Sequence, residues 1–504
     1  MVFGLRRFSP RRFLFFGSAF FVFGFLVYSL TPFTEPLPPY TGPHEVGILD
    51  VETEVKRRVI NEAKLKETGE RLFELETLAI TLYYPVSMPP TPRNNQPHAR
   101  PWLPQPISLI GTGYARMCHI YFPPLQAVFT FLLWFLGSKT VIPGHVDAPL
   151  ISAPEKVLLN ANDGPDGMAK IMLASQEVAK GENEAAGELG DLGTLPCVVF
   201  THGMAGMSQS YSHYLGSIAS HGYVVAAVEH RDGSGPGTIV HYADGKERKF
   251  WHIQVQDIES EPPMKLADLQ KAQLAYREAE LEETINLFRR LNAGEGMDIR
   301  NLKPESPEES LPGFKNRLNL SAITVAGHSY GATGALQALK NAPSKSMPIN
   351  GGIALDPGKG SGPLNKEIDV PLLVMQSGQW TEKQTQFYGQ GWHFDVVRKV
   401  VEGMKEGWFI TLTGTAHPSC TDAPLIVPWI MKLVTGTTLN PRVALKEYID
   451  VSVEFLEFLR NGDKKGVIKS DVTSPTGPLG DAEKRGKVKG KAGADWEVHV
   501  VPQT

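Results

Sequence analysis

The chain has 504 residues, of which 42% are hydrophobic and 21% are charged, so it can form one large globular domain with appendages. Its formal net charge of −4 gives no indication of a nucleic-acid partner. Three cysteines, Cys118, Cys197 and Cys420, are too few for a disulfide framework. Neither a nucleic-acid-binding domain nor a small disulfide-stabilised fold is therefore expected.

The N-terminal segment differs from the rest of the chain. Four arginines within residues 6–12 precede an apolar run at 13–30, which is about long enough to cross a bilayer. The arginines are expected on the cytoplasmic side, which places the remainder in a lumen or outside the cell. A cleaved signal peptide has the same charge order, but residues 28–32 make a poor cleavage site. We expect a single-pass membrane protein, secreted instead if the segment is cleaved.

Composition divides the chain into three parts. Residues 1–30 are the expected transmembrane signal anchor, and residues 31–460 the expected globular domain. Inside that domain, an acidic stretch rich in glycine and alanine at about 154–194 is expected to be an insertion loop. Residues 461–504 are rich in lysine, glycine and aspartate and are expected to form a charged, disordered tail.

Apolar strand patterns alternate with helical patterns along the globular part. This alternation predicts an α/β fold with a mostly parallel central sheet and helices on both faces. Strands are expected at 78–84, 197–200, 224–228, 322–326, 353–355, 372–376 and 409–413, and helices at 210–221, 266–291, 332–339 and 445–459.

A second apolar block runs from Leu125 to Leu136 and follows two prolines. It is too short to span a membrane. One interpretation is a buried core helix. The other is a lid or an interfacial helix that lies at a lipid surface. Its aromatic side chains suit either interpretation.

The turn Gly327-His328-Ser329-Tyr330-Gly331 is a G-x-S-x-G pentapeptide between an apolar strand and a helix of small residues. In that context it predicts a nucleophile elbow, where a strained turn lifts the serine Oγ above the sheet. The two glycines lack a Cβ and let the strand and the helix approach closely. Ser329 is therefore the predicted nucleophile.

A serine nucleophile needs an orienting acid and a base, which follow it in that order in hydrolases with this elbow. His417 is the predicted base, because it lies in a loop after a late strand, whereas His393 and His499 are less well placed. Asp356 ends the strand after the elbow and is the predicted acid. Glu382, which follows the next strand, is the alternative.

An oxyanion hole needs two backbone N–H donors. One is expected from Tyr330, directly after the nucleophile, and the other from Met204 in the turn at 201–206. The alternative interpretation is that residues 201–206 form an ordinary glycine-containing turn with no catalytic role. No H-E-x-x-H or C-x-x-C pattern occurs and the histidines lack ligand spacing, so no metal and no other cofactor is expected.

Three sequence blocks resemble the platelet-activating factor acetylhydrolases of the plasma and intracellular type II group. Residues 201–204 are similar to their S-H-G-L turn, 227–232 match the characteristic string A-V-E-H-R-D, and 327–332 are similar to their G-H-S-F-G-G elbow. Tyr330 and Ala332 depart from that elbow. The resemblance covers roughly 78–459. The two ends and the acidic insertion look unlike the animal enzymes and resemble a fungal-type, membrane-anchored member.

The resemblance implies an α/β-hydrolase fold and a calcium-independent serine lipase. Its substrates would be the short sn-2 acyl esters of glycerophospholipids such as platelet-activating factor, as for a 1-alkyl-2-acetylglycerophosphocholine esterase. It also supports Ser329, Asp356 and His417 as a catalytic triad, with Met204 and Tyr330 as oxyanion donors. The expected partners are phospholipid and the membrane, contacted through the anchor and the apolar block 125–136.

Smaller features of the family carry over as well. Its acid follows the strand directly after the elbow, and its histidine precedes an aspartate by five positions, as His417 precedes Asp422. Within the A-V-E-H-R-D string, Arg231 and Asp232 are expected to form a structural, ion-paired loop.

Three other functions remain open at this point. A general carboxylesterase or an acyltransferase would use the same triad, and the sequence does not separate them from a phospholipid hydrolase. A membrane-tethered binding protein on an inactive hydrolase scaffold is the alternative of a different class. The intact triad and oxyanion turn argue against it.

Overall fold

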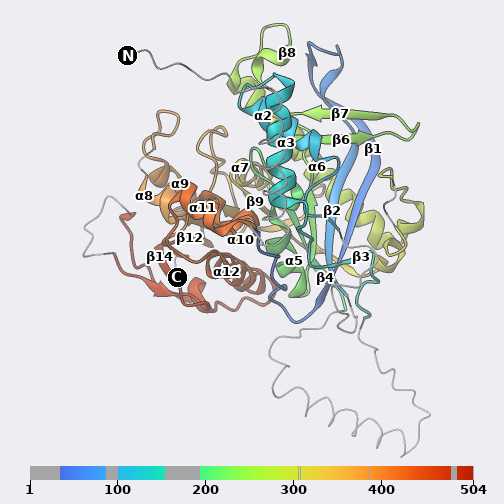
Figure 1. The fold of residues 1–504 in the computed structure, drawn as a ribbon. Coiled ribbons are helices and arrows are strands. Elements are labelled where there is room, and N and C mark those ends of the chain that lie inside the picture. Colours follow the sequence, from blue (N-terminus) through green and yellow to red (C-terminus); the bar gives the residue numbers. More distant parts are fainter. Residues whose placement is uncertain are drawn as a thin grey trace, which may run out of the picture.

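The computed structural model describes residues 34–86, 100–153, 193–304, 306, 308–383, 385–477 and 485–502. Their main feature is a sheet of twelve strands in the order β13-β14-β12-β11-β10-β9-β4-β5-β2-β1-β3, with β8 beside β1 (Figure 1). The strands from β5 across to β12 run parallel, and antiparallel pairs extend both edges. Helices cover both faces, which confirms the predicted fold class.

The strands and helices have the following bounds. The strands are β1 (Glu45–Leu65), β2 (Arg71–Val86), β3 (His145–Val146), β4 (Leu195–Thr201), β5 (Val224–Val228), β6 (Gly237–His241), β7 (Glu247–Trp251), β8 (Ile258–Glu259), β9 (Leu318–His328), β10 (Ile349–Leu355), β11 (Leu372–Ser377), β12 (Gly407–Leu412), β13 (Val488–Lys489) and β14 (Asp495–Val500). The helices are α2 (Ile107–Met117), α3 (Pro123–Gly137), α5 (Ser212–Ser220), α6 (Leu266–Ala293), α7 (Tyr330–Ala338), α8 (Gly378–Glu382), α9 (His393–Val401), α10 (Ala423–Ile426), α11 (Pro428–Thr435) and α12 (Pro441–Asn461).

The central strands are buried along almost their whole length. Strands β5, β11 and β12 contain no exposed residue, as expected for parallel strands covered on both faces. One core contains the apolar side chains of α6, α7 and α9, and the other contains those of α5 and α12. Parallel strands place their carboxyl ends at one edge of the sheet, and ligands of α/β proteins bind outside that edge.

The N-terminal hairpin is larger than predicted. The expected strand at 78–84 is the second half of β2, and β1, which was not predicted, pairs with it in antiparallel register from Glu45 opposite Val86. The second half of β1 alternates exposed and partly buried positions and carries many charges. This half packs on a smaller apolar cluster that includes residues of β2 and α6. Its many charges do not match the pattern of a buried strand.

The expected disordered tail is wrong for residues 485–502. Strand β14 pairs antiparallel with β12 and adds an edge to the main sheet. Trp496 is fully buried there, and its indole Nε1 donates to a carboxylate oxygen of Glu447 in α12 at 2.9 Å. The abundant lysines and glycines favoured the prediction of a disordered tail, although the tail contains a short strand with alternating polar and apolar residues. The globular domain therefore extends past residue 460.

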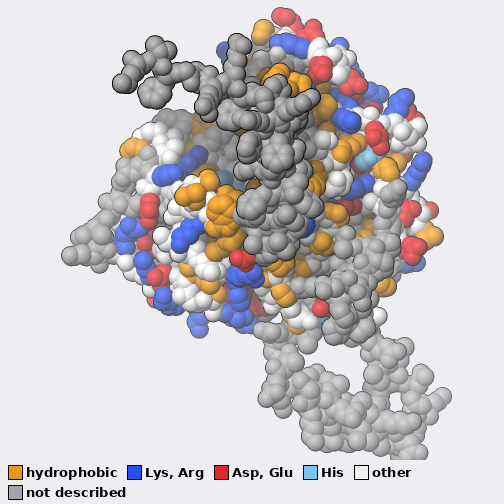
Figure 2. Space-filling view, viewed as in Figure 1, with side chains coloured by type: hydrophobic (Ala, Val, Ile, Leu, Met, Phe, Trp, Pro, Cys, Tyr) orange, Lys and Arg blue, Asp and Glu red, His pale blue; other side chains and the backbone are white. Residues whose placement is uncertain are grey.

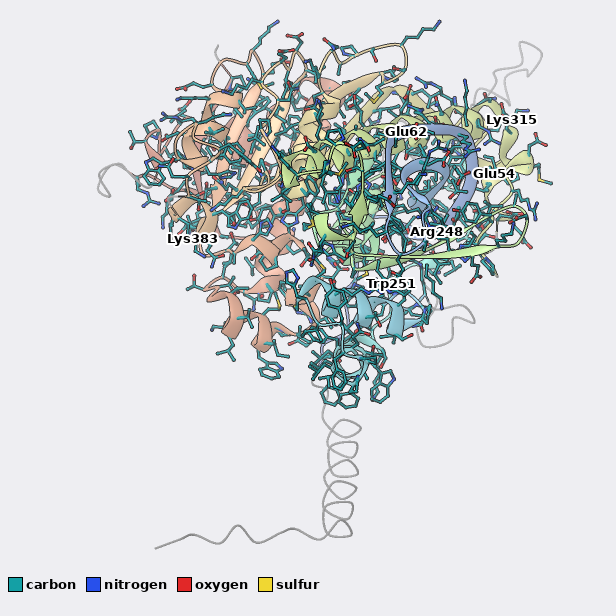
Figure 3. All side chains as sticks on the ribbon, turned by 90° about the horizontal axis from the view of Figure 1, so that it is seen from above. Glu54, Glu62, Arg248, Trp251, Lys315 and Lys383 are labelled. Atoms are coloured by element: carbon teal, nitrogen blue, oxygen red, sulfur yellow. The ribbon has the colours of Figure 1, made fainter. Side chains whose placement is uncertain are left out.

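The apolar block 125–136 lies in α3, and the interpretation as a core helix is wrong. Gly137 is the single buried residue of α3. Several of its large apolar side chains are between 38% and 49% exposed, namely Leu125, Val128, Phe131, Leu132 and Trp134. Helix α3 projects with its side chains from the body of the protein (Figure 3).

The expected single-pass membrane placement needs correction. In the part of the chain that the structure describes, no helix is long and apolar enough to cross a membrane. The predicted anchor at 13–30 lies outside the described residues, and so does the predicted acidic insertion except its last two residues. The described residues thus provide no transmembrane helix for the expected signal anchor with a lumenal or extracellular domain.

Candidate functional site

The predicted nucleophile lies in a strained turn. Ser329 joins β9 to α7 with φ 57° and ψ −119°, a conformation that non-glycine residues rarely adopt. The positions two residues before and two residues after Ser329 have no room for a side chain. A Cβ at Gly327 would lie 2.3 Å from the carbonyl oxygen of Gly331, and one at Gly331 would lie 1.9 Å from that of Thr201. Both glycines of the pentapeptide are thus sterically required.

The predicted acid and base lie within hydrogen-bond distance of each other. Asp356 directly follows β10, and its Oδ2 accepts from Nδ1 of His417 at 2.9 Å. The carboxylate also accepts from the backbone N–H of Ser377 at 2.6 Å and from its hydroxyl at 2.7 Å. Because Nδ1 carries the proton in this bond, Nε2 of a neutral His417 is an acceptor.

Two rings hold the imidazole of His417. The indole of Trp380 stacks on it with a centroid distance of 3.9 Å and an interplanar angle of 4°, and the ring of His328 lies 4.3 Å away. Burial keeps the pKa of His328 well below its ordinary value, so it adds no positive charge next to His417. His328 in turn bonds the hydroxyl of Tyr211 at 2.8 Å. The base is therefore fixed in position as well as hydrogen-bonded.

A cavity of about 230 Å³ brings three of the predicted site residues together. Ser329, His417 and Met204 line it, along with Trp102 and with Leu133 of α3. Tyr330 begins α7, and the first N–H groups of a helix have no acceptor within it. The turn that carries Met204 follows β4, the strand next to β9. Both predicted oxyanion donors thus flank the nucleophile.

The alternative base and acid residues have other roles. His393 Nε2 donates to the carbonyl of Pro357 at 2.9 Å, and its Nδ1 lies 3.1 Å from the Gln376 amide. His499 lies in β14, where it forms hydrogen bonds with Ser474 and Thr411. Glu382 is exposed and lines a separate cavity. His417 and Asp356 are therefore the pair that the fold brings together.

A fully buried arginine, which the sequence did not single out, supports both oxyanion segments. Arg277 of α6 donates from Nη1 to the carbonyl of His202 at 2.6 Å, two residues before Met204. Its guanidinium also lies over the Tyr330 ring, 4.6 Å from the centroid. Its Nε pairs with Asp232 at 2.7 Å. One side chain therefore links the turn after β4 to the start of α7.

The charged residues of the A-V-E-H-R-D string differ in their partners. His230 bonds the buried carboxylate of Glu280, Arg231 pairs with Glu52, and Asp232 pairs with Arg277. The predicted ion-paired loop is therefore present. Glu229, the first charged residue of the string, forms no ion pair with a described residue, although Arg231 and Lys303 are close enough to influence its pKa.

Three potential metal ligands also lie in this site. His328, Asp356 and His417 place one ligand atom each within 4.8 Å of one another. Asp356 and His417 already share a hydrogen bond, and His328 bonds Tyr211 through Nδ1, which leaves Nε2 of His328 without a described partner. The set fits an acid–base pair with a supporting ring better than a metal centre, which needs its ligand atoms free to point at one ion.

Known structures place the chain in a fold class. A solved ferulic acid esterase from Streptomyces cinnamoneus superposes with a TM-score of 0.52 at 15% identity, covering 87% of this chain and 96% of the other. At that identity the likeness concerns the fold alone. Together with the elbow after β9, it identifies the α/β-hydrolase class.

Sequence comparison is more specific. The family model described as platelet-activating factor acetylhydrolase, isoform II, matches residues 167–471. The chain therefore belongs to this family, as the resemblance predicted. Membership makes it a serine ester hydrolase in the broad sense.

Curated relatives are distant. Platelet-activating factor acetylhydrolase of Cavia porcellus is 24% identical over 68% of this chain and 70% of its own length. The enzyme of the same name from Canis lupus familiaris is 29% identical, with 51% of this chain and 53% of the relative covered. A putative phospholipase A2 of Schizosaccharomyces pombe is 31% identical over 28% of this chain and 34% of its own. The chain thus spans about half of the dog enzyme.

Proposed function

We propose that the chain hydrolyses the sn-2 acyl ester of glycerophospholipids, with short acyl chains preferred. Ser329 is the nucleophile, His417 the general base and Asp356 the orienting acid. The observation that carries the proposal is the 2.9 Å bond from His417 to Asp356, with Ser329 and His417 on the wall of one cavity. The family relatives named above support the phospholipid substrate.

The reaction follows from the placement of these groups. Nε2 of His417 accepts the Ser329 hydroxyl proton while Oγ attacks the acyl carbon. The N–H groups of Met204 and Tyr330 stabilise the resulting oxyanion. His417 then returns the proton to the leaving glycerol oxygen, which frees the lysophospholipid. Water, deprotonated by His417, cleaves the acyl-enzyme and releases the fatty acid. Asp356 keeps the imidazole in the required tautomer, and no step needs calcium.

Two exposed apolar helices give the site a lipid-facing rim. Helix α11 contains no buried residue, and Leu433 and Val434 are 80% and 73% exposed. Hydrophobic side chains gather over it in Figure 2, and it projects from the same side of the molecule as α3 in Figure 3. Because Leu133 of α3 also lines the reaction cavity, a lipid layer contacted by α3 lies next to Ser329.

A turnover assay tests the proposal. Phospholipids with sn-2 acetyl, hexanoyl and palmitoyl chains are compared with a simple acetate ester and with an added acceptor alcohol. We expect hydrolysis of the short-chain phospholipids that EDTA does not inhibit. Turnover of the simple ester alone would favour a general carboxylesterase, and transfer to the alcohol in preference to water would favour an acyltransferase. Strong inhibition by EDTA would contradict the metal-free mechanism.

A further inference from the structure

A second cavity of about 370 Å³ lies beside the reaction cavity. The two share Leu103 in their walls. A single turn separates them, since Met207 and Ser210 face the reaction cavity while Ser208 and Gln209 face the second one. A substrate in the reaction cavity is thus next to the second cavity.

One group of charges in this second cavity carries a surplus positive charge. Asp50 pairs with Arg100 at 2.6 Å and with Lys303 at 2.7 Å, so one carboxylate faces two cations. Burial alone would raise the pKa of Asp50, but the two cations outweigh it and hold that pKa well below its usual range. The group therefore stays ionised with a net charge of about +1, which suits a bound anion.

Another wall of the cavity carries the carboxylate of Glu229, whose pKa is raised by burial although Ser208, Arg231 and Lys303 act in the opposite direction. Oε2 of Glu229 accepts from the backbone N–H and the hydroxyl of Ser208, at 2.8 and 2.9 Å. Within the described residues no lysine, arginine or histidine forms an ion pair with Glu229, and its Oε1 has no donor. Its three charged neighbours in the A-V-E-H-R-D string are all paired internally. A partly buried carboxylate of this kind favours a cation.

We propose that this cavity binds the zwitterionic head group of the phospholipid, with the phosphate beside Arg100 and Lys303 and a protonated amine on Glu229. The inference rests on the proposed function, because the glycerol backbone is what joins the head group to the ester at Ser329. The position fits, since that backbone is short and the two cavities adjoin at Leu103.

The lining also distinguishes between amines. None of the described residues that line this cavity is a phenylalanine, tyrosine or tryptophan, whereas trimethylammonium groups are recognised by the rings of those residues. A primary ammonium can donate N–H hydrogen bonds to Oε1 of Glu229. A quaternary ammonium has no N–H group and cannot. Charge-assisted hydrogen bonds of this kind are strong. The cavity therefore prefers an ethanolamine head group to a choline head group.

The first test compares two substrates with the same sn-2 acetyl ester, one with an ethanolamine and one with a choline head group. The readout is the ratio of their kcat/KM values, which a general loss of activity does not change. We expect the intact protein to favour ethanolamine about tenfold or more. Glu229→Gln, which keeps an acceptor for Ser208 but removes the charge, abolishes most of that preference. An unchanged ratio in Glu229→Gln, or no preference in the intact protein, overturns the inference.

Glu62→Gln is the matched control, because Glu62 is an exposed carboxylate of β1 on the opposite side of the molecule from α3 (Figure 3). The ratio stays at the unmodified value in this variant. Thermal unfolding checks that Glu229→Gln folds.

A binding measurement separates failure of the inference from failure of the proposed function. Calorimetry with free phosphoethanolamine gives binding to the intact protein, weaker binding of phosphocholine, and loss of binding in Glu229→Gln. Such binding without any phospholipid turnover refutes the proposed function but supports the binding site in the second cavity. Binding of phosphoethanolamine with equal turnover of both head groups shows a site for a free phosphoamine and contradicts a lipid head-group site. Absence of binding contradicts the site itself.

Discussion

Asp356 and His417 come from loops 61 positions apart. Chain order and strand ends made both of them candidates, and the family resemblance favoured Asp356 over Glu382. The supporting side chains were not predictable. Trp380 stacks on His417 and Arg277 bonds the His202 carbonyl through contacts that no local pattern encodes. Residues that carry the chemistry follow family motifs, whereas residues that hold them depend on the packing of distant elements.

The role of Asp356 can be separated from that of the alternative acid. Asp356→Asn leaves the geometry in place but no longer favours the Nδ1–H tautomer of His417. We expect kcat to fall roughly 10³- to 10⁴-fold with little change in KM. Glu382→Gln, which removes an exposed carboxylate, keeps the activity of the intact protein. The opposite pattern in steady-state kinetics would make Glu382 the orienting acid.

Arg277 is expected to act as a positioning residue. Arg277→Lys keeps a cation opposite Asp232 but loses the forked contact with the His202 carbonyl and the Tyr330 ring. We expect kcat to fall about 10- to 100-fold with KM unchanged, because only the transition state uses the oxyanion donors.

Arg290→Lys is the control for this variant, since Arg290 lies on the same helix and pairs with the partly exposed Glu295. Its kinetics stay those of the unmodified protein. A rise in KM with kcat unchanged in Arg277→Lys would instead place Arg277 in substrate binding.

At the scale of elements, α3 shows what an apolar pattern leaves undecided. Its composition suits a core helix and a surface helix equally, and the choice depends on whether another element covers it. Strand β14 shows the reverse case, in which a polar tail contains a strand because β12 offers a free edge. The buried apolar strands β4 and β9 were predicted, whereas β1 and β14, which carry many charged or polar residues, were not.

The lipid-facing role of α3 leads to a test at this scale. Leu132→Asp places a charge on its exposed face and should weaken contact with a lipid surface. We expect the ratio of activity on vesicle-borne substrate to activity on monomeric substrate to fall about tenfold. Met297→Asp introduces the same charge at an 81% exposed apolar residue of another segment and should keep the ratio. Equal ratios for the two variants would remove α3 from lipid binding.

At the scale of the whole molecule, strand β14 extends the sheet that carries the site beyond β12. His499 of β14 donates from Nδ1 to the carbonyl of Ser474, and its Nε2 accepts from the hydroxyl of Thr411 in β12. Burial lowers the pKa of His499 to about 4. The ring is therefore neutral in the folded protein, where it links the tail to the central strands.

This histidine makes stability depend on pH in a defined direction. Between about pH 6.5 and 4 the unfolded chain takes up a proton at His499 that the folded protein does not, so stability falls as the pH falls. His499→Gln lacks this proton. We expect its deficit in unfolding temperature to be largest near pH 7 and to shrink toward pH 4. A constant difference across that range would mean that His499 is not buried as a neutral ring.

The identity of the nucleophile is the central claim, and one labelling measurement tests it most directly. The full chain is treated with a fluorophosphonate, digested and analysed by mass spectrometry. We predict a single adduct on the peptide that contains Ser329, with loss of esterase activity in proportion to labelling, and no adduct in Ser329→Ala. An adduct on another residue, or labelling that persists in Ser329→Ala, would contradict the account.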